Sequence, residues 1–337
     1  MNHRFLWAAA LAWVAALCAI LLLFRFVGET AWPVVLLLYW PRAIWLAPGL
    51  ALLPFALRRG RRALLVPLAA GTLLWMFPVM GFVVPFPRGG SGSPTLRILS
   101  YNTTHTVDGP EVLRAMVMEE KPDLVLFQWT SHLADEALSG PWFKGWTVRR
   151  SFQFTIASRY FIASLEPIGI PSGSGPPCAH AVVETPLGAL DVYAIRPLSA
   201  REEIGAGRGW GIRQRLRIFL SELRTGKLEQ LAAFREGQVR SIAEAVARAQ
   251  HPVVIAGDTN LPDGSLFLER YFGKFGDAFE QAGWAFGYTH PAKLPWLRLD
   301  RVLLGPELEA VSFDVLGHHA SAHRAIVAEI RSAAAGR

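Results

Sequence analysis

The segment Val254-Ile255-Ala256-Gly257-Asp258-Thr259-Asn260 is an apolar run that ends abruptly in polar residues. A short apolar run bounded by turn-forming residues is typical of a buried strand. The carboxylate and amide that follow it are side chains that can hold a hard cation or position a water molecule. The same three polar residues also make a good turn without any ligand. The motif alone therefore leaves a functional and a structural interpretation open.

Outward from this segment, the chain holds further polar signatures at the ends of apolar runs: Ser100-Tyr101-Asn102, Lys121–Gln128, Ser158-Arg159-Tyr160, Arg298–Val302 and Ser321–Arg324. Short apolar runs separated by turns and a few helical patterns predict a layered α+β or α/β domain. We predict strands at 96–100, 124–127, 154–157, 180–184, 190–195, 253–256, 298–303 and 325–330. Helices are predicted near 109–120, 228–249 and 265–271.

These six signatures, in this order, resemble the endonuclease/exonuclease/phosphatase superfamily over about residues 95–332, and in particular its bacterial membrane-anchored members. The resemblance implies an α+β fold, a two-sheet β-sandwich flanked by helices, whose strand ends cleave phosphate esters with Mg²⁺. By position, Asp258 would orient the attacking water and His323 would donate to a phosphoryl oxygen. Asp300 would pair with His323 and keep it protonated.

The resemblance also assigns phosphate-binding residues. Asn102 would touch the metal shell or the phosphate, and Asn260 would bind phosphate. Arg196 stands at the end of the central strand where the family usually has a histidine. A purely structural reading is also open, in which Asp300 and His323 are a hydrogen-bonded pair and residues 258–260 form a turn.

Two positions depart from the family pattern. The glutamate that serves the family as principal metal ligand is Trp129 here, and the aspartate of its Ser-Asp-His signature is Ala322. Mg²⁺ takes oxygen ligands, which neither tryptophan nor alanine supplies. Loss of such a ligand costs orders of magnitude in rate. The metal site is therefore predicted to be degenerate and the presence of Mg²⁺ is left open.

Three hypotheses follow from this degenerate site. The chain is a pseudoenzyme that binds a phosphorylated ligand or nothing, or its metal site is displaced onto Asp258, Asp263 or Glu184. The third hypothesis is a metal-free phosphoesterase in which Arg196 supplies part of the cation's charge. An active enzyme would act on a lipid-linked phosphate or pyrophosphate rather than on duplex DNA.

Residues 1–88 have the composition of a membrane anchor with two or three transmembrane helices. Apolar segments at 6–23, 31–57 and 63–86 are long enough to cross or enter a bilayer. The second segment is interrupted by Pro41-Arg42, and the neighbouring Trp40 and Trp45 place Arg42 at an interface. Residues 89–94 (GGSGSP) read as a flexible linker to the 95–332 domain.

The charge distribution predicts the orientation of the anchor and the class of partner. Arg58-Arg59-Gly60-Arg61-Arg62 lies between the second and third segments, and such loops stay in the cytoplasm. Three spans then place the C-terminal domain on the outer, periplasmic side of an inner (cytoplasmic) membrane. Residues 1–90 carry a formal charge of +7, whereas residues 91–337 are neutral, which makes nucleic acid an unlikely partner and membrane lipids the expected one.

Residues 196–227 look like a basic amphipathic insertion. This segment would lie on an anionic membrane or line a substrate site, or it would pack its apolar face on the domain. The histidines and the two cysteines show no zinc-like spacing. A transporter or channel built from the spans is disfavoured, because Arg42 is the one charge within the apolar segments.

Overall fold

The structure is a computed structural model that describes residues 2–58, 60–85, 93–104, 109–129, 132–173, 175–199, 227–317 and 321–333. The predicted linker at 89–94 falls largely outside these residues. So does the predicted basic insertion at 196–227, of which only the first four residues and Lys227 are described.

Two six-stranded sheets form the domain. The first has the order β11-β12-β1-β2-β4-β3 and the second the order β5-β6-β7-β8-β10-β9. The first sheet consists of β1 (Thr95–Asn102), β2 (Leu124–Gln128), β3 (Thr147–Ser151), β4 (Phe154–Ser158), β11 (Leu308–Val315) and β12 (Ile326–Ser332). The second consists of β5 (Ile162–Ile168), β6 (Cys178–Thr185), β7 (Gly188–Ile195), β8 (Val253–Asp258), β9 (Gly276–Asp277) and β10 (Asp300–Leu304).

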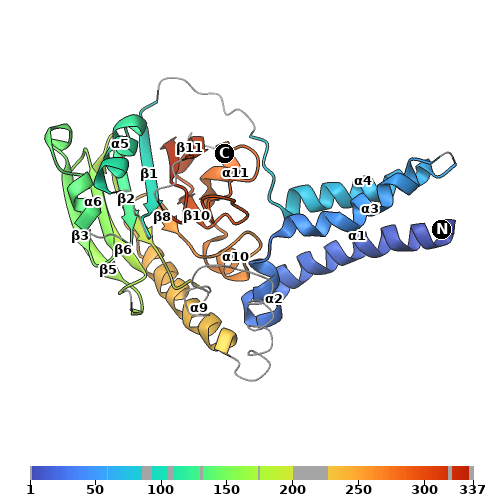
Figure 1. Cartoon of the computed structure of the whole chain (residues 1–337). Helices are drawn as coiled ribbons and strands as arrows, with labels where there is room; N and C mark the ends of the chain where they lie inside the picture. Colours follow the sequence, from blue (N-terminus) through green and yellow to red (C-terminus); the bar gives the residue numbers. More distant parts are fainter. Residues whose placement is uncertain are drawn as a thin grey trace.

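The sheets pack face to face over a dry apolar core that contains Ile98, Leu126, Val192, Val254 and Ile326. Helices cover the outer faces (Figure 1). On the first sheet these are α5 (Pro110–Glu120) and α6 (His132–Ala137), and on the second α9 (Lys227–Val246) and α10 (Leu266–Phe272). The short α11 (Ala278–Ala282) and η5 (Pro141–Phe143) complete the domain. The predicted two-sheet sandwich with flanking helices is confirmed.

The predicted strands at 96–100, 124–127, 154–157, 180–184, 190–195, 253–256, 298–303 and 325–330 correspond to β1, β2, β4, β6, β7, β8, β10 and β12. Sequence reasoning missed β3, β5, β9 and β11. β3 and β9 are edge strands, β9 has only two residues, and β11 carries a bulge between Ala310 and Ser312 that interrupts its alternation.

Strand direction brings the signature residues to one edge of the sandwich. β1 and β2 run parallel, so Asn102 and Gln128 pair where both strands end. β10 runs antiparallel to β8, and its first residue Asp300 is the register partner of Asp258, the last residue of β8. β12 runs antiparallel to β1, which brings the residues before β12, including His323, to the same edge.

The N-terminal part is a bundle of helices that projects from the domain (Figure 1). Its elements are α1 (His3–Phe26), η1 (Gly28–Thr30), α2 (Trp32–Leu38), η2 (Arg42–Leu46), α3 (Ala47–Ala56), η3 (Arg62–Leu64), α4 (Leu65–Leu74) and η4 (Trp75–Val79). Segments His3–Phe26 and Arg62–Val79 are each long and apolar enough to cross a membrane. Trp32–Leu38 and Arg42–Ala56 pass the same test only together and are bent by 88°.

The bundle and the domain share a small core. Phe24, Val35, Leu38 and Tyr39 pack with Leu297 and Leu299, which lead into β10. Below we call the contact region between the bundle and the domain the junction.

Polar groups also cross the junction. Arg42 donates to the carbonyl oxygens of Val79 (2.8 Å) and Asp263 (2.5 Å), so this arginine ties the bundle to the domain. The buried carboxylate of Glu29 accepts from Leu266 N–H (3.0 Å) and from Ser265 Oγ at the start of α10. These contacts make the bundle and the domain one packed unit in the described part of the chain.

Candidate active site

The end of β8 supplies Asp258 and Asn260. Asp258 is buried, and its Oδ1 accepts the backbone N–H of Asn260 (2.9 Å), which forms the turn that the sequence allowed. Asn260 has a left-handed backbone (φ 49°), and its side-chain Nδ2 donates to Pro197 O (2.9 Å). Strand β8 therefore ends in a tightly held polar loop.

Asp300 and His323 form a buried pair next to Asp258. The Nδ1 of His323 and Oδ2 of Asp300 are 2.8 Å apart, and Nε2 of His323 lies 3.7 Å from Oδ2 of Asp258. The imidazole thus stands between two carboxylates. Sequence reasoning placed these three residues together, and the structure does so; their catalytic roles stay predictions.

Asn102 joins the site from β1. Its Nδ2 donates to Asp258 Oδ2 (2.8 Å), and its Oδ1 accepts from Thr104 N (3.0 Å) and from the Thr104 hydroxyl. The amide oxygen, the atom that would contact a cation, is thus engaged by Thr104. Asn102 orients Asp258 in this structure.

Burial and the neighbouring positive charges shift the pKa of Asp258 in opposite directions. Burial raises the pKa of the Asp258 carboxyl and Asp300 adds to the rise, whereas His323 and Arg196 lower it. The net direction is upward, so this carboxyl is more readily protonated than an exposed aspartate.

Trp129 stands at the position that the resemblance assigns to the main metal ligand, and Arg196, at the end of the central strand, lies against it. The Arg196 guanidinium carbon lies 4.1 Å from the Trp129 ring centroid, close enough for a cation–π contact. Arg196 is buried and also donates to Gln153 Oε1 (3.1 Å), whereas the Trp129 side chain is partly exposed. A fixed guanidinium charge therefore stands beside the polar residues.

The polar residues at this edge offer few free ligand atoms to Mg²⁺. In the part of the chain that the structure describes, Asp258, Asp300 and His323 are the group able to hold a metal, with ligand atoms within 4.8 Å of one another. Both oxygens of Asp258 already accept hydrogen bonds, and Arg196 adds a positive charge nearby. Mg²⁺ prefers oxygen ligands and keeps several waters, which this buried set does not readily allow. The residues present do not fit the metal chemistry implied for the family.

Two hypothesised ligands lie elsewhere. The start of β6 lies near the candidate site, because Cys178 pairs with Ile195, the neighbour of Arg196. Glu184 is exposed near the other end of β6 and therefore lies away from the site. Asp263 is held by Arg298 (2.7 Å) and Arg301 (2.7 Å). A displaced site that used Glu184 or Asp263 is therefore wrong, because strand direction and a competing ion cluster keep both from Asp258.

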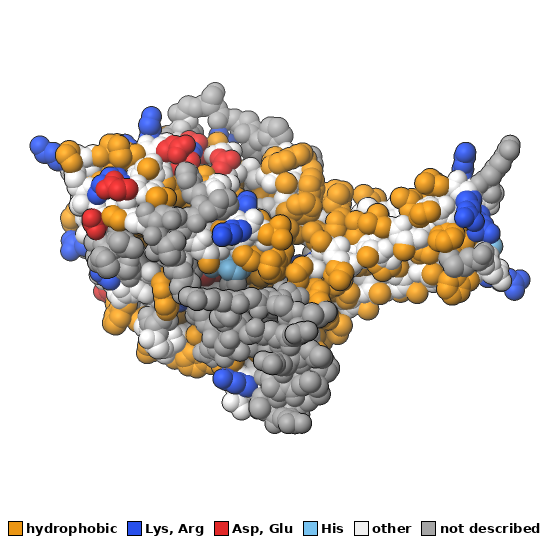
Figure 2. Space-filling model, viewed as in Figure 1, with side chains coloured by type: hydrophobic (Ala, Val, Ile, Leu, Met, Phe, Trp, Pro, Cys, Tyr) orange, Lys and Arg blue, Asp and Glu red, His pale blue; other side chains and the backbone are white. Residues whose placement is uncertain are grey.

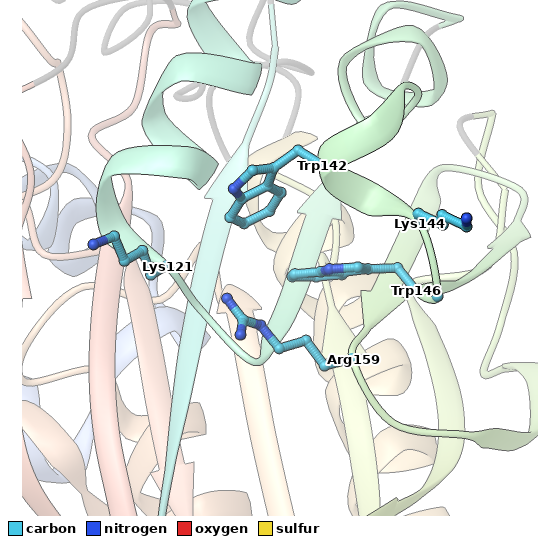
Figure 3. A pocket seen from close by; sticks show the side chains of 6 residues that line it. Lys121, Trp142, Lys144, Trp146 and Arg159 are labelled. Atoms are coloured by element: carbon cyan, nitrogen blue, oxygen red, sulfur yellow. The ribbon is translucent and has the colours of Figure 1, made fainter.

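The Ser158-Arg159-Tyr160 signature and the first residues of the Lys121–Gln128 signature are not brought to this edge. Asp123 precedes β2 and Arg159 follows β4, so both lie at the opposite end of the first sheet. There, Trp142, Trp146 and Arg159 line a pocket of about 390 Å³ (Figure 3). Arg159 stacks on both indoles (5.7 and 5.5 Å to the ring centroids), and Lys121 and Lys144 extend away from them. These residues support the sheet rather than the candidate site.

Sequence reasoning missed three contributors to the site. Thr104 fixes Asn102, and His290 lies against His323 with 4.6 Å between ring centroids. Tyr39 of the bundle donates its hydroxyl to Asn260 O (2.6 Å), and Arg235 of α9 donates to that hydroxyl (3.0 Å). No local sequence signal marks Tyr39, because its partner is more than two hundred residues away.

A family model described as Endonuclease/Exonuclease/phosphatase family matches residues 99–323, and the chain belongs to that family. Its domain is therefore of the phosphoesterase-like class that this fold and these strand-end residues define. Comparison with curated proteins finds no match.

Two solved structures illustrate the fold. A humanized TDP2 of D. rerio is similar with 16% identity and a TM-score of 0.50, over 71% of this chain and 99% of that one. The human Nocturnin catalytic domain with a bound sulfate anion is similar with 12% identity and a TM-score of 0.50, over 71% of this chain and 94% of that one. At these identities the similarity shows the fold alone.

Proposed function

We propose that this chain is a membrane-anchored phosphoester-binding protein whose hydrolytic activity is weak or absent. The observation that carries the proposal is the Arg196 guanidinium stacked 4.1 Å from the Trp129 ring. A guanidinium binds phosphate oxygens well and never deprotonates at physiological pH. Arg196 thus takes over part of the charge that a divalent cation supplies in the family, without the Lewis acidity that drives hydrolysis.

The remaining residues support anion binding. His323, held between Asp300 and Asp258, is suited to donate Nε2–H to a phosphoryl oxygen. Asp258 is available to position a water molecule, but both of its oxygens already accept hydrogen bonds, from Asn102 and from Asn260, and its raised pKa reduces the fraction that is ionised and able to accept a proton. These residues are therefore suited to bind a phosphate ester more than to cleave it.

The expected ligand is a lipid-linked phosphate or pyrophosphate. Tyr39 hydrogen-bonds the carbonyl of Asn260, so the candidate site adjoins the helical bundle that we propose as membrane anchor. A phosphate on a membrane lipid would reach such a site without leaving the bilayer. The absence of net charge on residues 91–337 gives no support to duplex DNA, whose binding depends on phosphate neutralisation.

A second candidate function is that of an active phosphodiesterase or phosphatase. It is favoured by Asp258, Asp300 and His323, whose ligand atoms lie within 4.8 Å of one another. Oδ1 of Asp300 is buried without a hydrogen-bond partner in the structure. If a cation binds here, these three residues hold it, and the chain is then an active hydrolase.

The experiment uses the full chain in detergent micelles. Binding of inorganic phosphate and hydrolysis of bis(p-nitrophenyl) phosphate, phosphatidic acid, an isoprenyl pyrophosphate and plasmid DNA are measured with Mg²⁺ and with EDTA. We expect phosphate binding that EDTA leaves unchanged and that Arg196→Gln weakens by about tenfold or more, with Arg196→Lys intermediate. The exposed Arg240→Gln is the matched control.

Mg²⁺-dependent hydrolysis that both Asp258→Ala and His323→Ala abolish would overturn the proposal in favour of the active enzyme. Plasmid degradation of that kind would also refute the lipid-linked substrate.

A further inference from the structure

A cavity of about 700 Å³ lies at the junction, apart from the candidate active site. The bundle contributes Leu21 and Phe24 of α1, Phe77 of η4 and the following Phe82, and the domain contributes Leu268 and Phe272 of α10. Its volume lies within the range of roughly 300–1,000 Å³ that small-molecule sites occupy. The wall that these residues form is apolar, so water gains few hydrogen bonds there.

The cavity lies where both candidate spans end. α1 ends at Phe26 and the second span ends at Val79, and each span contributes its last turns to the wall. Hydrophobic side chains cover the bundle and continue onto the adjoining face of the domain (Figure 2). In a membrane-anchored chain, the cavity is therefore level with the bilayer surface and open to lipid chains.

Charged groups of both signs border the apolar wall. Arg25 at the end of α1 pairs with Glu269 of α10 (Nη1 to Oε1, 3.1 Å), and both side chains are more than half exposed. Glu280 is also largely exposed and lies 3.2 Å from Arg298. The accessible rim thus offers one cation and two carboxylates, a set that complements a headgroup with both a phosphate and an ammonium.

We propose that this cavity binds one zwitterionic, amine-bearing phospholipid, with an acyl chain between Phe24, Phe77 and Phe272. The phosphate would face Arg25, and the ammonium would face Glu269 and Glu280. The two carboxylates at the rim disfavour a purely anionic headgroup. This inference rests on the proposed membrane anchoring and is independent of the chemistry at Asp258.

The test measures which lipid stays with the protein. The full chain is purified in mild detergent from a membrane that contains phosphatidylethanolamine and phosphatidylglycerol, and bound lipid is identified by native mass spectrometry. We expect phosphatidylethanolamine at about one molecule per chain. Leu268→Trp, which fills the cavity, should reduce the amount of bound phosphatidylethanolamine at least fivefold. Val311→Trp on the exposed face of β11 should leave this amount unchanged.

Charge reversal provides a second variant that leaves the core intact. Glu269→Lys lies on the exposed rim and should shift the bound lipid towards phosphatidylglycerol. Unchanged lipid in both Leu268→Trp and Glu269→Lys, or a wild-type preference for phosphatidylglycerol, would overturn the lipid site. Recovery of the wild-type chain in the soluble fraction would instead refute the anchoring on which the inference rests.

Discussion

Trp129 places an indole that attracts a cation at the position where the family resemblance leads us to expect a charged oxygen ligand. Its ring binds Arg196 face-on, and the pair fills space beside the Asp258–His323–Asp300 group. On our proposal, this one position both lacks a metal ligand and holds a permanent positive charge beside the site.

Restoring the carboxylates should restore metal binding. We expect Trp129→Glu combined with Ala322→Asp to raise Mg²⁺ affinity at least about tenfold, or ~1.4 kcal/mol, because hard oxygen ligands return to the site. Isothermal titration calorimetry of the variant and the wild type measures the change. Tight Mg²⁺ binding by the unmodified chain would contradict this prediction and our account of the site.

At the level of elements, the end of α2 supports the loop that follows β8. Helix α2 is bent away from the following helix, and its end presents Tyr39 to the carbonyl of Asn260. Because Asn260 has a left-handed backbone, this hydrogen bond helps to hold a conformation that an asparagine adopts at some cost.

Tyr39→Phe should loosen this loop. Tyr39→Phe removes two buried hydrogen bonds, to Asn260 O and from Arg235, and the bond to Asn260 O is the one that holds the loop. Losing that bond costs about 1 kcal/mol, so we expect phosphate affinity to fall about fivefold. Tyr288→Phe is the matched control, since the Tyr288 hydroxyl donates to Met80 O (2.7 Å) at the same junction. Equal affinity losses in the two variants would show that Tyr39 supports the junction alone and not the site.

A buried ion cluster supports the loop that follows β8. Asp263 and Asp277 accept hydrogen bonds from Arg298 and Arg301 at 2.6–3.0 Å. The two arginines hold the pKa of the Asp263 carboxyl well below its usual range, although burial opposes this shift. Asp263 is therefore ionised in the folded chain at all ordinary pH values.

The depressed pKa predicts acid sensitivity. The ionised Asp263 carboxylate stabilises the fold fully above its unfolded-state pKa of about 4. This stabilisation is lost as pH falls towards the lower folded-state pKa. Asp263→Asn should lower stability by roughly 3 kcal/mol or more at pH 7 and flatten the decline in Tm between pH 5 and pH 3. Exposed Asp314→Asn serves as the control, and identical pH profiles for wild type and Asp263→Asn would contradict the assignment.

The whole molecule combines a family domain with a bundle that has two or three membrane-spanning candidates. The ends of α3 and α4 that the arginine-rich sequence 58–62 connects lie at the end of the bundle far from the domain (Figure 1). Because such arginines stay in the cytoplasm, we predict that the domain lies outside it.

Fusion of alkaline phosphatase after Arg337 should therefore give an active reporter, and fusion of a cytoplasm-dependent fluorescent protein should give none. Replacing the four arginines with glutamine should reduce the fraction of chains that place the C-terminal reporter outside the cytoplasm. Activity of the cytoplasmic reporter alone would reverse the orientation.

The two-sheet sandwich, the family and the residues Asp258, Asn102, Asp300 and His323 could be predicted from the amino-acid sequence, because apolar runs and the polar residues that end them are local signals. β8, β1 and the segment before β12 could be located in this way, and strand direction then had to bring Asp258, Asn102 and His323 to one edge. The edge strand β3 and the bulged strand β11 were not predicted, because exposure and the bulge remove the alternation of apolar and polar residues that marks a strand.

The contacts among these residues could not be predicted from the sequence. That Arg196 stacks on Trp129, that Thr104 engages the oxygen of Asn102, and that Tyr39 reaches Asn260 depend on contacts between distant segments. The tertiary structure also excluded Glu184 and Asp263 as metal ligands. The physical reason is that charge and hydrogen bonding act through space over a few ångströms, whereas sequence spacing records only distance along the chain.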